Sequence, residues 1–139
     1  MATSPTYPTA TGPVLIAKRL LPADGTNTVD VYDNSAGSSG VKIEALTIVT
    51  NNTADRIATF YLYSGTTAFN LGSIDIPDLS GTNGAIDPKI NILTTLGVEG
   101  ADGVSCLWIP AGKKLQVSLD TALAANKILD IVGRGIVYS

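Results

Sequence analysis

The residues best suited to chemistry in this sequence are oxygen ligands that cluster in two predicted loops. They are Asp75, Asp78, Asn83 and Asp87 in the first loop, and Glu99 and Asp102 in the second. Hard oxygen ligands contributed by loops suit Ca²⁺. Their spacing differs from that of an EF-hand, and Asp and Asn in loops ordinarily cap turns. We therefore predict no metal site and no cofactor, and calcium is the best ligand hypothesis that stays open.

Histidine is absent from the chain. Its absence removes the commonest general base and metal ligand, and the base of every Ser–His or Cys–His nucleophile pair. Two carboxylates facing each other across a cleft could still serve a glycosidase, and the sequence leaves this open for Glu44 and Glu99. Gly97, Gly100 and Gly103 lack the strand–turn–helix context of a phosphate loop. We predict that the protein is not an enzyme.

The single cysteine and the single tryptophan lie in one apolar run, Val104–Ile109. One cysteine permits no intramolecular disulfide, and an unpaired cysteine is commonly a small buried side chain. Because every position from Cys106 to Ile109 is apolar, the run predicts a buried strand with Trp108 in the core.

Composition narrows the class of protein. The 139 residues suit one domain, with 45% hydrophobic and only 15% charged residues and a net charge of −3. Nine basic residues spread along the chain do not form the cationic face that nucleic acid requires. The N-terminus lacks the pattern of a secretory signal, and no apolar stretch is long enough to span a membrane. We expect assembly in a cytoplasm.

Two regions differ in character. Residues 1–13 are rich in Thr, Pro, Ser and Ala, which favours a flexible, extended N-terminal arm. This arm is either a frayed terminus or a segment that becomes ordered on a neighbouring subunit, with Tyr7 and Pro8 as its anchors. Residues 14–139 form the predicted domain.

Short apolar runs separated by turn residues predict an all-β domain. The expected strands are 14–20, 28–33, 41–50, 57–64, 68–76, 104–109, 114–120 and 128–138, with 89–96 either a strand or a short helix. This pattern predicts an antiparallel two-sheet β-sandwich of jelly-roll-like topology.

Three details of the pattern sharpen the prediction. Residues 41–50 and 57–64 are expected to pair as a hairpin across a polar turn. The alternation shifts at Ala45–Leu46, which indicates a bulge or a strand buried on both faces. Residues 78–87 are expected to form an exposed loop, and residues 121–127 a connector with room for one helical turn.

Tyr61 and Tyr63 lie on the strand face opposite Phe60 and Leu62. They point either to solvent and a partner or to a second buried face of the sandwich. Tyrosine combines contact area with one hydroxyl and is favoured at interfaces, so both tyrosines are candidate partner-binding residues.

Two segments resemble elements of small tailed-bacteriophage virion proteins. One is the run Leu46–Thr53 followed by Ala58–Tyr63, similar to a strand, Asn-rich turn and strand in those proteins. The other is the run Trp108–Val117, similar to a Pro-Ala-Gly turn followed by an alternating strand. The resemblance implies a capsid decoration (cement) protein, a head-fibre base or a small tail component. It also implies other virion proteins as partners, a homo-oligomer, and a place in the virion after assembly in the host cytoplasm.

A binding module for carbohydrate or a host surface, with or without calcium, is the alternative. A sandwich with carboxylates in its loops could act in this way, although aromatic residues make up only 6% of the chain. Neither alternative involves nucleic acid or a membrane.

Overall fold

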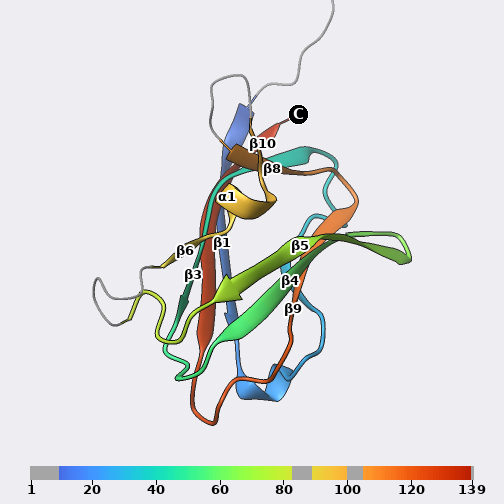
Figure 1. The fold of residues 1–139 in the computed structure, drawn as a ribbon. Helices are drawn as coiled ribbons and strands as arrows, with labels where there is room; N and C mark the ends of the chain where they lie inside the picture. The colour runs from blue at the N-terminus through green and yellow to red at the C-terminus, as the bar shows by residue number, and fades with distance from the viewer. Residues whose placement is uncertain (1–9, 83–88, 100–104, 139) are drawn as a thin grey trace, which may run out of the picture.

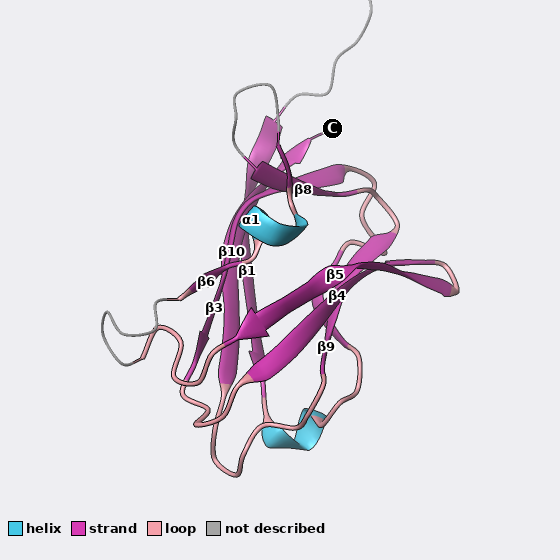
Figure 2. Cartoon of the chain, in the orientation of Figure 1, coloured by secondary structure: helices cyan, strands magenta, loops and turns pink. Residues whose placement is uncertain are grey.

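The computed structural model describes residues 10–82, 89–99 and 105–138, which form two antiparallel sheets packed face to face (Figures 1 and 2). Sheet A contains β1 (Ala10–Leu20), β10 (Leu129–Tyr138), β3 (Gly40–Thr50), β8 (Ser105–Ile109) and β7 (Val98–Glu99), with β6 (Ile90–Asn91) also paired to β3. Sheet B contains β2 (Val29–Asp33), β9 (Lys113–Leu119), β4 (Arg56–Ser64) and β5 (Thr67–Ile76). The helices are the 3-10 turn η1 (Pro22–Asp24) and α1 (Leu93–Leu96). The chain is an all-β sandwich, as predicted.

The strand order is that of a jelly roll. Sheet A runs β1-β10-β3-β8 and sheet B runs β2-β9-β4-β5. The chain crosses from one sheet to the other at most connections, whereas the β4–β5 hairpin stays within sheet B and the consecutive strands β7 and β8 pair within sheet A. As a result, the first and last strands are neighbours, with β1 antiparallel to β10 along almost their whole length.

The core fills the space between the sheets. In β9, Leu115, Val117 and Leu119 alternate inward, as the sequence predicted. The largest fully buried side chains come from both sheets and from the segment before α1: Phe60, Ile16, Ile43, Leu46, Ile48, Ile76, Ile92, Ile109, Leu115, Leu129, Ile131 and Val41. Each fully buried side chain of this size contributes about 1.5–3 kcal/mol relative to an exposed one.

The predicted arm is shorter than expected at its C-terminal end. Residues 10–13 belong to β1, where Ala10 lies opposite Tyr138 and Pro13 opposite Ile136. Local composition favoured an extended, unpaired segment, but pairing with β10 fixes these residues in the sheet. Proline is tolerated here because β1 is an edge strand. Residues 1–9, with Tyr7 and Pro8, lie outside the described residues.

The expected hairpin between residues 41–50 and 57–64 is wrong. Strand β3 belongs to sheet A and pairs with β10, β8 and β6, whereas β4 belongs to sheet B and pairs with β5 and β9. The polar segment between β3 and β4 is a corner that carries the chain from one sheet to the other. A hairpin turn within one sheet and a corner between two sheets can both be short polar connections between two β-type runs. The local sequence pattern therefore did not distinguish a turn from a corner.

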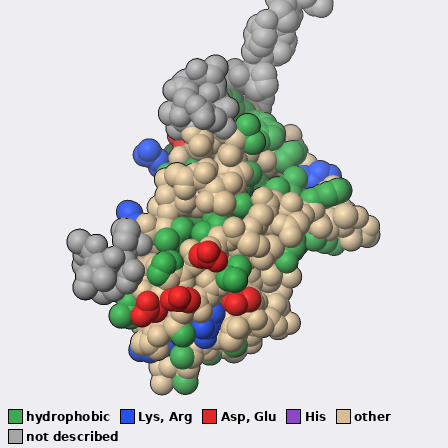
Figure 3. All heavy atoms as spheres, viewed as in Figure 1, with side chains coloured by type: hydrophobic (Ala, Val, Ile, Leu, Met, Phe, Trp, Pro, Cys, Tyr) green, Lys and Arg blue, Asp and Glu red, His purple; other side chains and the backbone are tan. Residues whose placement is uncertain are grey.

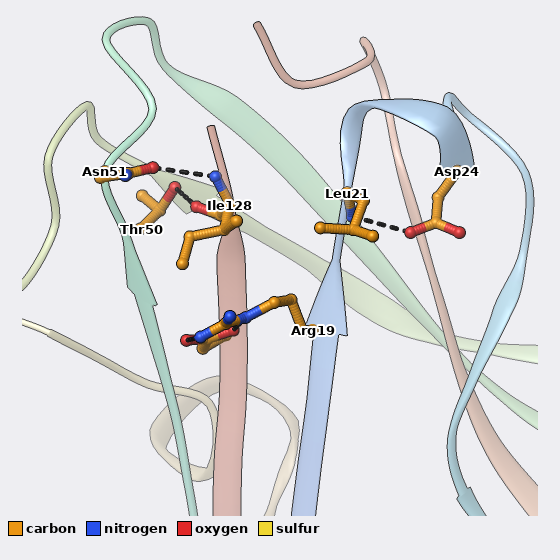
Figure 4. Close-up of polar contacts among 7 residues, drawn as sticks. Arg19, Leu21, Asp24, Thr50, Asn51 and Ile128 are labelled. Atoms are coloured by element: carbon orange, nitrogen blue, oxygen red, sulfur yellow. Dashed lines mark hydrogen bonds and ion pairs between the residues drawn. The ribbon is translucent and has the colours of Figure 1, made fainter. Parts of the chain in front are cut away.

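Two asparagines hold this corner in place. The buried Asn52 side chain donates to the Ala54 carbonyl at 2.7 Å and accepts from the Ala124 backbone N–H at 3.0 Å. The Asn51 side chain accepts from the Ile128 N–H at 2.8 Å (Figure 4). The corner is therefore joined to the segment that leads into β10, far away in the sequence.

The bulge predicted near Ala45–Leu46 is present. Arg134 of β10 lies opposite Ala45, and the next residue, Gly135, lies opposite Ile43, so Glu44 is the extra residue of β3. Gly133 lies beside the bulge, where an added Cβ would come within 2.1 Å of the Ala45 carbonyl oxygen. The two strands can approach this closely only because the position is glycine.

Three connecting segments complete the fold. Residues 89–96 contain both the short strand β6 and helix α1, so each of the two predicted alternatives describes part of the segment. Residues 121–127 form no helical turn. Within the predicted exposed loop, the described part includes Ser80, which is fully buried and accepts a backbone hydrogen bond from Thr50. A backbone contact with the end of β3 therefore holds the start of this loop.

Candidate functional site

The outer face of sheet B is polar, and its side chains bond to one another. The Gln116 side chain donates to Asp30 at 2.8 Å, and the Lys114 ammonium lies 3.3 Å from the same carboxylate and 3.8 Å from that of Asp33. The hydrogen bond and the charge of Asp30 raise the pKa of Lys114. These side chains therefore direct most of their hydrogen bonds and ion pairs to one another, within sheet B.

Tyr61 and Tyr63 lie on this polar face, and both are half-buried. The Tyr61 hydroxyl is 3.2 Å from the Ser118 hydroxyl, and the Lys114 ammonium lies 5.8 Å from the centre of the Tyr63 ring. The two predicted partner-binding tyrosines are therefore brought together on one face, with contacts inside their own sheet.

The outer face of sheet A is more apolar. The β1–β10 register places Leu15 beside Arg134, Ala17 beside Val132, and Arg19 beside Asp130, giving three consecutive cross-strand rows. These six residues are called the β1–β10 grid below. Leu15 is 77% exposed and Val132 is 46% exposed. Exposed aliphatic side chains on adjacent strands are typical of a surface that another molecule covers.

Trp108 belongs to the same face and is not in the core, contrary to the prediction. It is 46% exposed, whereas its neighbours Leu107 and Ile109 point inward and are buried. The apolar run of β8 thus serves two faces: alternate residues enter the core and the others, including Trp108, point outward. Counting apolar residues missed this surface tryptophan, whereas period-two alternation would have found it.

Tyr138 and Gly40 hold the Trp108 ring against the sheet. The Trp108 and Tyr138 ring centres are 5.9 Å apart with the planes inclined at 50°, a tilted aromatic pair. A Cβ added at Gly40 would lie 2.2 Å from the Trp108 ring, so the ring lies directly over the Gly40 backbone. Val98, 73% exposed on β7, is paired with Cys106 two residues before Trp108. Together Trp108, Tyr138 and Val98 form the aromatic end of this face.

Charges on the outer face of sheet A are only partly matched. Arg19 reaches from β1 to β10 and donates two hydrogen bonds to the Asp130 carboxylate, at 2.8 and 2.9 Å (Figure 4). The hydrogen bond and the charge of Asp130 raise the pKa of Arg19. Arg134 and Lys42 form no ion pair within the described part of the chain.

Carboxylates gather on the opposite side of the molecule, at one end of sheet B (Figure 3). Asp55, Asp75 and Asp120 line an open groove of about 380 Å³. Asp120 accepts the Ile57 backbone N–H at 2.8 Å and Asp55 accepts the Asp78 backbone N–H at 2.9 Å. Asp120 and Asp55 thus cap backbone groups, which is the ordinary role expected of Asp in turns.

Only some of the residues named in the open calcium hypothesis are described. Asp75 and Asp78 are described, whereas Asn83, Asp87, Asp102 and the Glu99 side chain lie outside the described residues. Across residues 10–82, 89–98 and 105–138, no three His, Cys, Asp or Glu side chains are grouped so as to hold a metal ion. Calcium binding by the full set therefore stays an open hypothesis.

No family model and no curated protein matches this chain. No described helix is long and apolar enough to cross a membrane.

Proposed function

We propose that the protein is a non-enzymatic structural subunit of a tailed-bacteriophage particle, specifically a capsid decoration protein that stabilises the head through protein–protein contacts. The observation that carries the proposal is the aromatic end of sheet A. A tryptophan left 46% exposed and backed by a tyrosine is the kind of anchor that dominates protein–protein interfaces.

Three further features support this proposal. The jelly-roll order is common in viral capsid proteins, although the fold by itself does not determine function. Two of the three groove carboxylates, those of Asp55 and Asp120, accept backbone hydrogen bonds, which is a structural role. The outer face of sheet A exposes Leu15, Trp108 and Val132, which suits that face to be covered by another protein. The partners we propose are the major capsid protein or neighbouring structural subunits, and further copies of this chain.

The experiment that tests the proposal is to ask whether the chain is a component of the particle. Particles of the virus that encodes it are purified on a density gradient, separated into heads and tails, and examined by quantitative mass spectrometry. The proposal expects the chain in the head fraction at a fixed ratio to the major capsid protein. Its absence from purified particles would refute a structural role, and its presence in tails alone would refute the decoration role.

Two single variants then test the surface. Trp108→Ser removes the exposed ring, while Tyr63→Ser removes an aromatic side chain from the opposite outer face. If the aromatic end of sheet A is the contact, heads lacking the chain bind wild type and Tyr63→Ser alike and bind Trp108→Ser much more weakly. Equal binding of all three proteins would place the contact elsewhere.

Carbohydrate binding is the second candidate, because the same exposed aromatic pair could stack on a sugar ring. The 50° inclination of the two rings makes them a poor flat platform, which favours the first candidate. Glycan-array binding that Trp108→Ser abolishes would favour carbohydrate binding. A rise in melting temperature when calcium is added would indicate that the loop carboxylates bind calcium as well.

A further inference from the structure

The β1–β10 grid, at the β1 edge of the outer face of sheet A, has the form of a self-complementary contact. Its central row is Ala17 and Val132, and the two flanking rows differ in character. Leu15 and Arg134 lie on one side of the centre, and Arg19 and Asp130 lie on the other. Because residues on one face of a strand repeat about every 6.6 Å, the flanking rows are equally distant from the central row.

One flanking row projects and the other is hollow. Leu15 is 77% exposed. On the other side of the centre, an open hollow of about 310 Å³ is lined by Ala17, Lys18, Arg19, Asp130 and Val132. The projecting side chain and the hollow are separated by the central row alone.

We propose that two copies of this protein associate through the β1–β10 grid about a two-fold axis that crosses the strands at Ala17 and Val132. Such an axis places the projecting row of each copy over the hollow row of the other. Leu15 then enters the partner's hollow, and Arg134 faces the partner's Asp130. Val132 packs against its own counterpart at the axis.

Charge matching favours a second copy of this chain as the molecule that covers the β1–β10 grid. Arg134 forms no ion pair within the described residues, whereas Asp130, with its side chain 28% exposed, retains acceptor capacity beyond its bonds to Arg19. The two-fold contact therefore builds an alternating network of Arg19, Asp130 and the partner's Arg134, formed twice. A two-fold axis parallel to the strands would bring Arg19 of each copy to the partner's Asp130, a pair that already exists within each copy. Arg134 would then have no carboxylate opposite it.

The size of the contact sets its strength. Strands β1, β10 and β3 cover about 14 Å across the sheet at roughly 4.8 Å per strand, and ten residues cover about 33 Å along it. A face of this size, about 460 Å² per partner, is smaller than the roughly 800 Å² per partner of a standard stable interface. We expect a dimer that forms at high protein concentration and is favoured when copies are held close together on a particle.

This inference deepens the proposed function and rests on the same sheet, but it uses different residues. The aromatic end lies beyond the grid and is left uncovered by the two-fold contact. Self-association and particle binding can therefore fail separately. A chain that binds heads through Trp108 but never dimerises would overturn the inference and leave the proposed function standing.

The test is sedimentation equilibrium of the full chain, from low micromolar to several hundred micromolar concentration. The inference expects a reversible monomer–dimer equilibrium. Leu15→Ser should weaken the dimer by about tenfold or more, as expected for loss of a central apolar anchor. Val98→Ser is the matched control: Val98 is an equally exposed aliphatic residue of the same sheet outside the grid, and its replacement should leave the equilibrium unchanged.

A charge exchange tests the predicted pairing directly. Arg134→Glu places two carboxylates opposite each other and should weaken the dimer. Combining it with Asp130→Lys and Arg19→Glu reverses all three charges of the network and should restore the dimer. Melting temperature and tryptophan fluorescence verify that each variant is folded. A chain that stays monomeric at every concentration overturns the inference. A dimer that Leu15→Ser does not affect, or that the variant with all three charges reversed does not restore, overturns it as well.

Discussion

Replacing Asn52 by alanine tests how the corner between the two sheets is held. The Asn52 side chain is fully buried and makes two hydrogen bonds, to the Ala54 carbonyl at 2.7 Å and from the Ala124 N–H at 3.0 Å. Alanine keeps the backbone and removes both bonds. It also leaves a small void next to the Thr50 hydroxyl, which accepts the Asn52 backbone N–H.

The magnitude follows from the groups left without partners. A buried polar group that loses its hydrogen bond costs about 1–3 kcal/mol. The bonds of Asn52 are only part-buried at their far ends, so water can reach one of the two abandoned groups. We therefore expect a loss of about 2–4 kcal/mol in the free energy of unfolding. With an unfolding entropy of about 2.1 cal/mol/K per residue, the melting temperature should fall by about 7–14 °C.

Thermal and urea unfolding measured by circular dichroism provide the assay. Asn27→Ala is the matched control, because Asn27 is exposed in the turn before β2, and its replacement should change the stability by less than about 0.5 kcal/mol. If Asn52→Ala and Asn27→Ala were equally stable, the corner would not depend on the Asn52 side chain and the reasoning would be refuted.

Three further predictions concern single positions. Gly133→Ala should prevent stable folding or cost several kcal/mol, because its Cβ would come within 2.1 Å of the Ala45 carbonyl oxygen; normal unfolding of this variant by urea would contradict the predicted clash. Gly40→Ala should displace the only tryptophan, since its Cβ would lie 2.2 Å from the Trp108 ring, and should change the emission maximum with little loss of stability; an unchanged spectrum would show that the ring does not lie on Gly40. Two hydrogen bonds from Ser35 hold the pKa of Asp33 below its usual value of 3.8. The bond from the Ser35 side chain has the larger effect, and the bond from its backbone N–H has the smaller one. Because the folded-state pKa is the lower one, Asp33 stabilises the fold above pH 3.8, and this contribution is lost as the pH falls through the folded-state pKa. Asp33→Asn should therefore be less stable than wild type near pH 6 and equal to it in strong acid, and a difference that grows on acidification would reverse the assignment.

The local sequence pattern was sufficient to predict the strands and their buried faces. The alternation of Leu115, Val117 and Leu119 fixed both the element and its buried face, because one face of β9 meets the core and the other meets polar neighbours. The shift at Ala45–Leu46 was likewise a local signal of the bulge. In both cases the information needed lies within one strand.

Pairing between strands was beyond local pattern. Asn51–Asp55 looks like a hairpin turn because short polar segments between apolar runs usually are. What makes it a corner is the hydrogen bonding of Asn52 to Ala124, 72 positions later in the sequence. Trp108 is different: period-two alternation within β8, with Leu107 and Ile109 buried, already places it outward. Only its contacts with Gly40 and Tyr138 depend on distant parts of the chain.

The same limit explains why the candidate surface could not be predicted. Leu15 and Val132 are 117 positions apart in the sequence, and each by itself is an unremarkable strand residue. They become a surface only because the jelly roll places the first strand beside the last, with the register that aligns Ala17 with Val132. A shift of that register by one residue would send Leu15 into the core and bring Ile16 to the surface. The burial of Ile16 therefore fixes the register, and the register determines the pattern of projections, hollows and charges that a second copy could match.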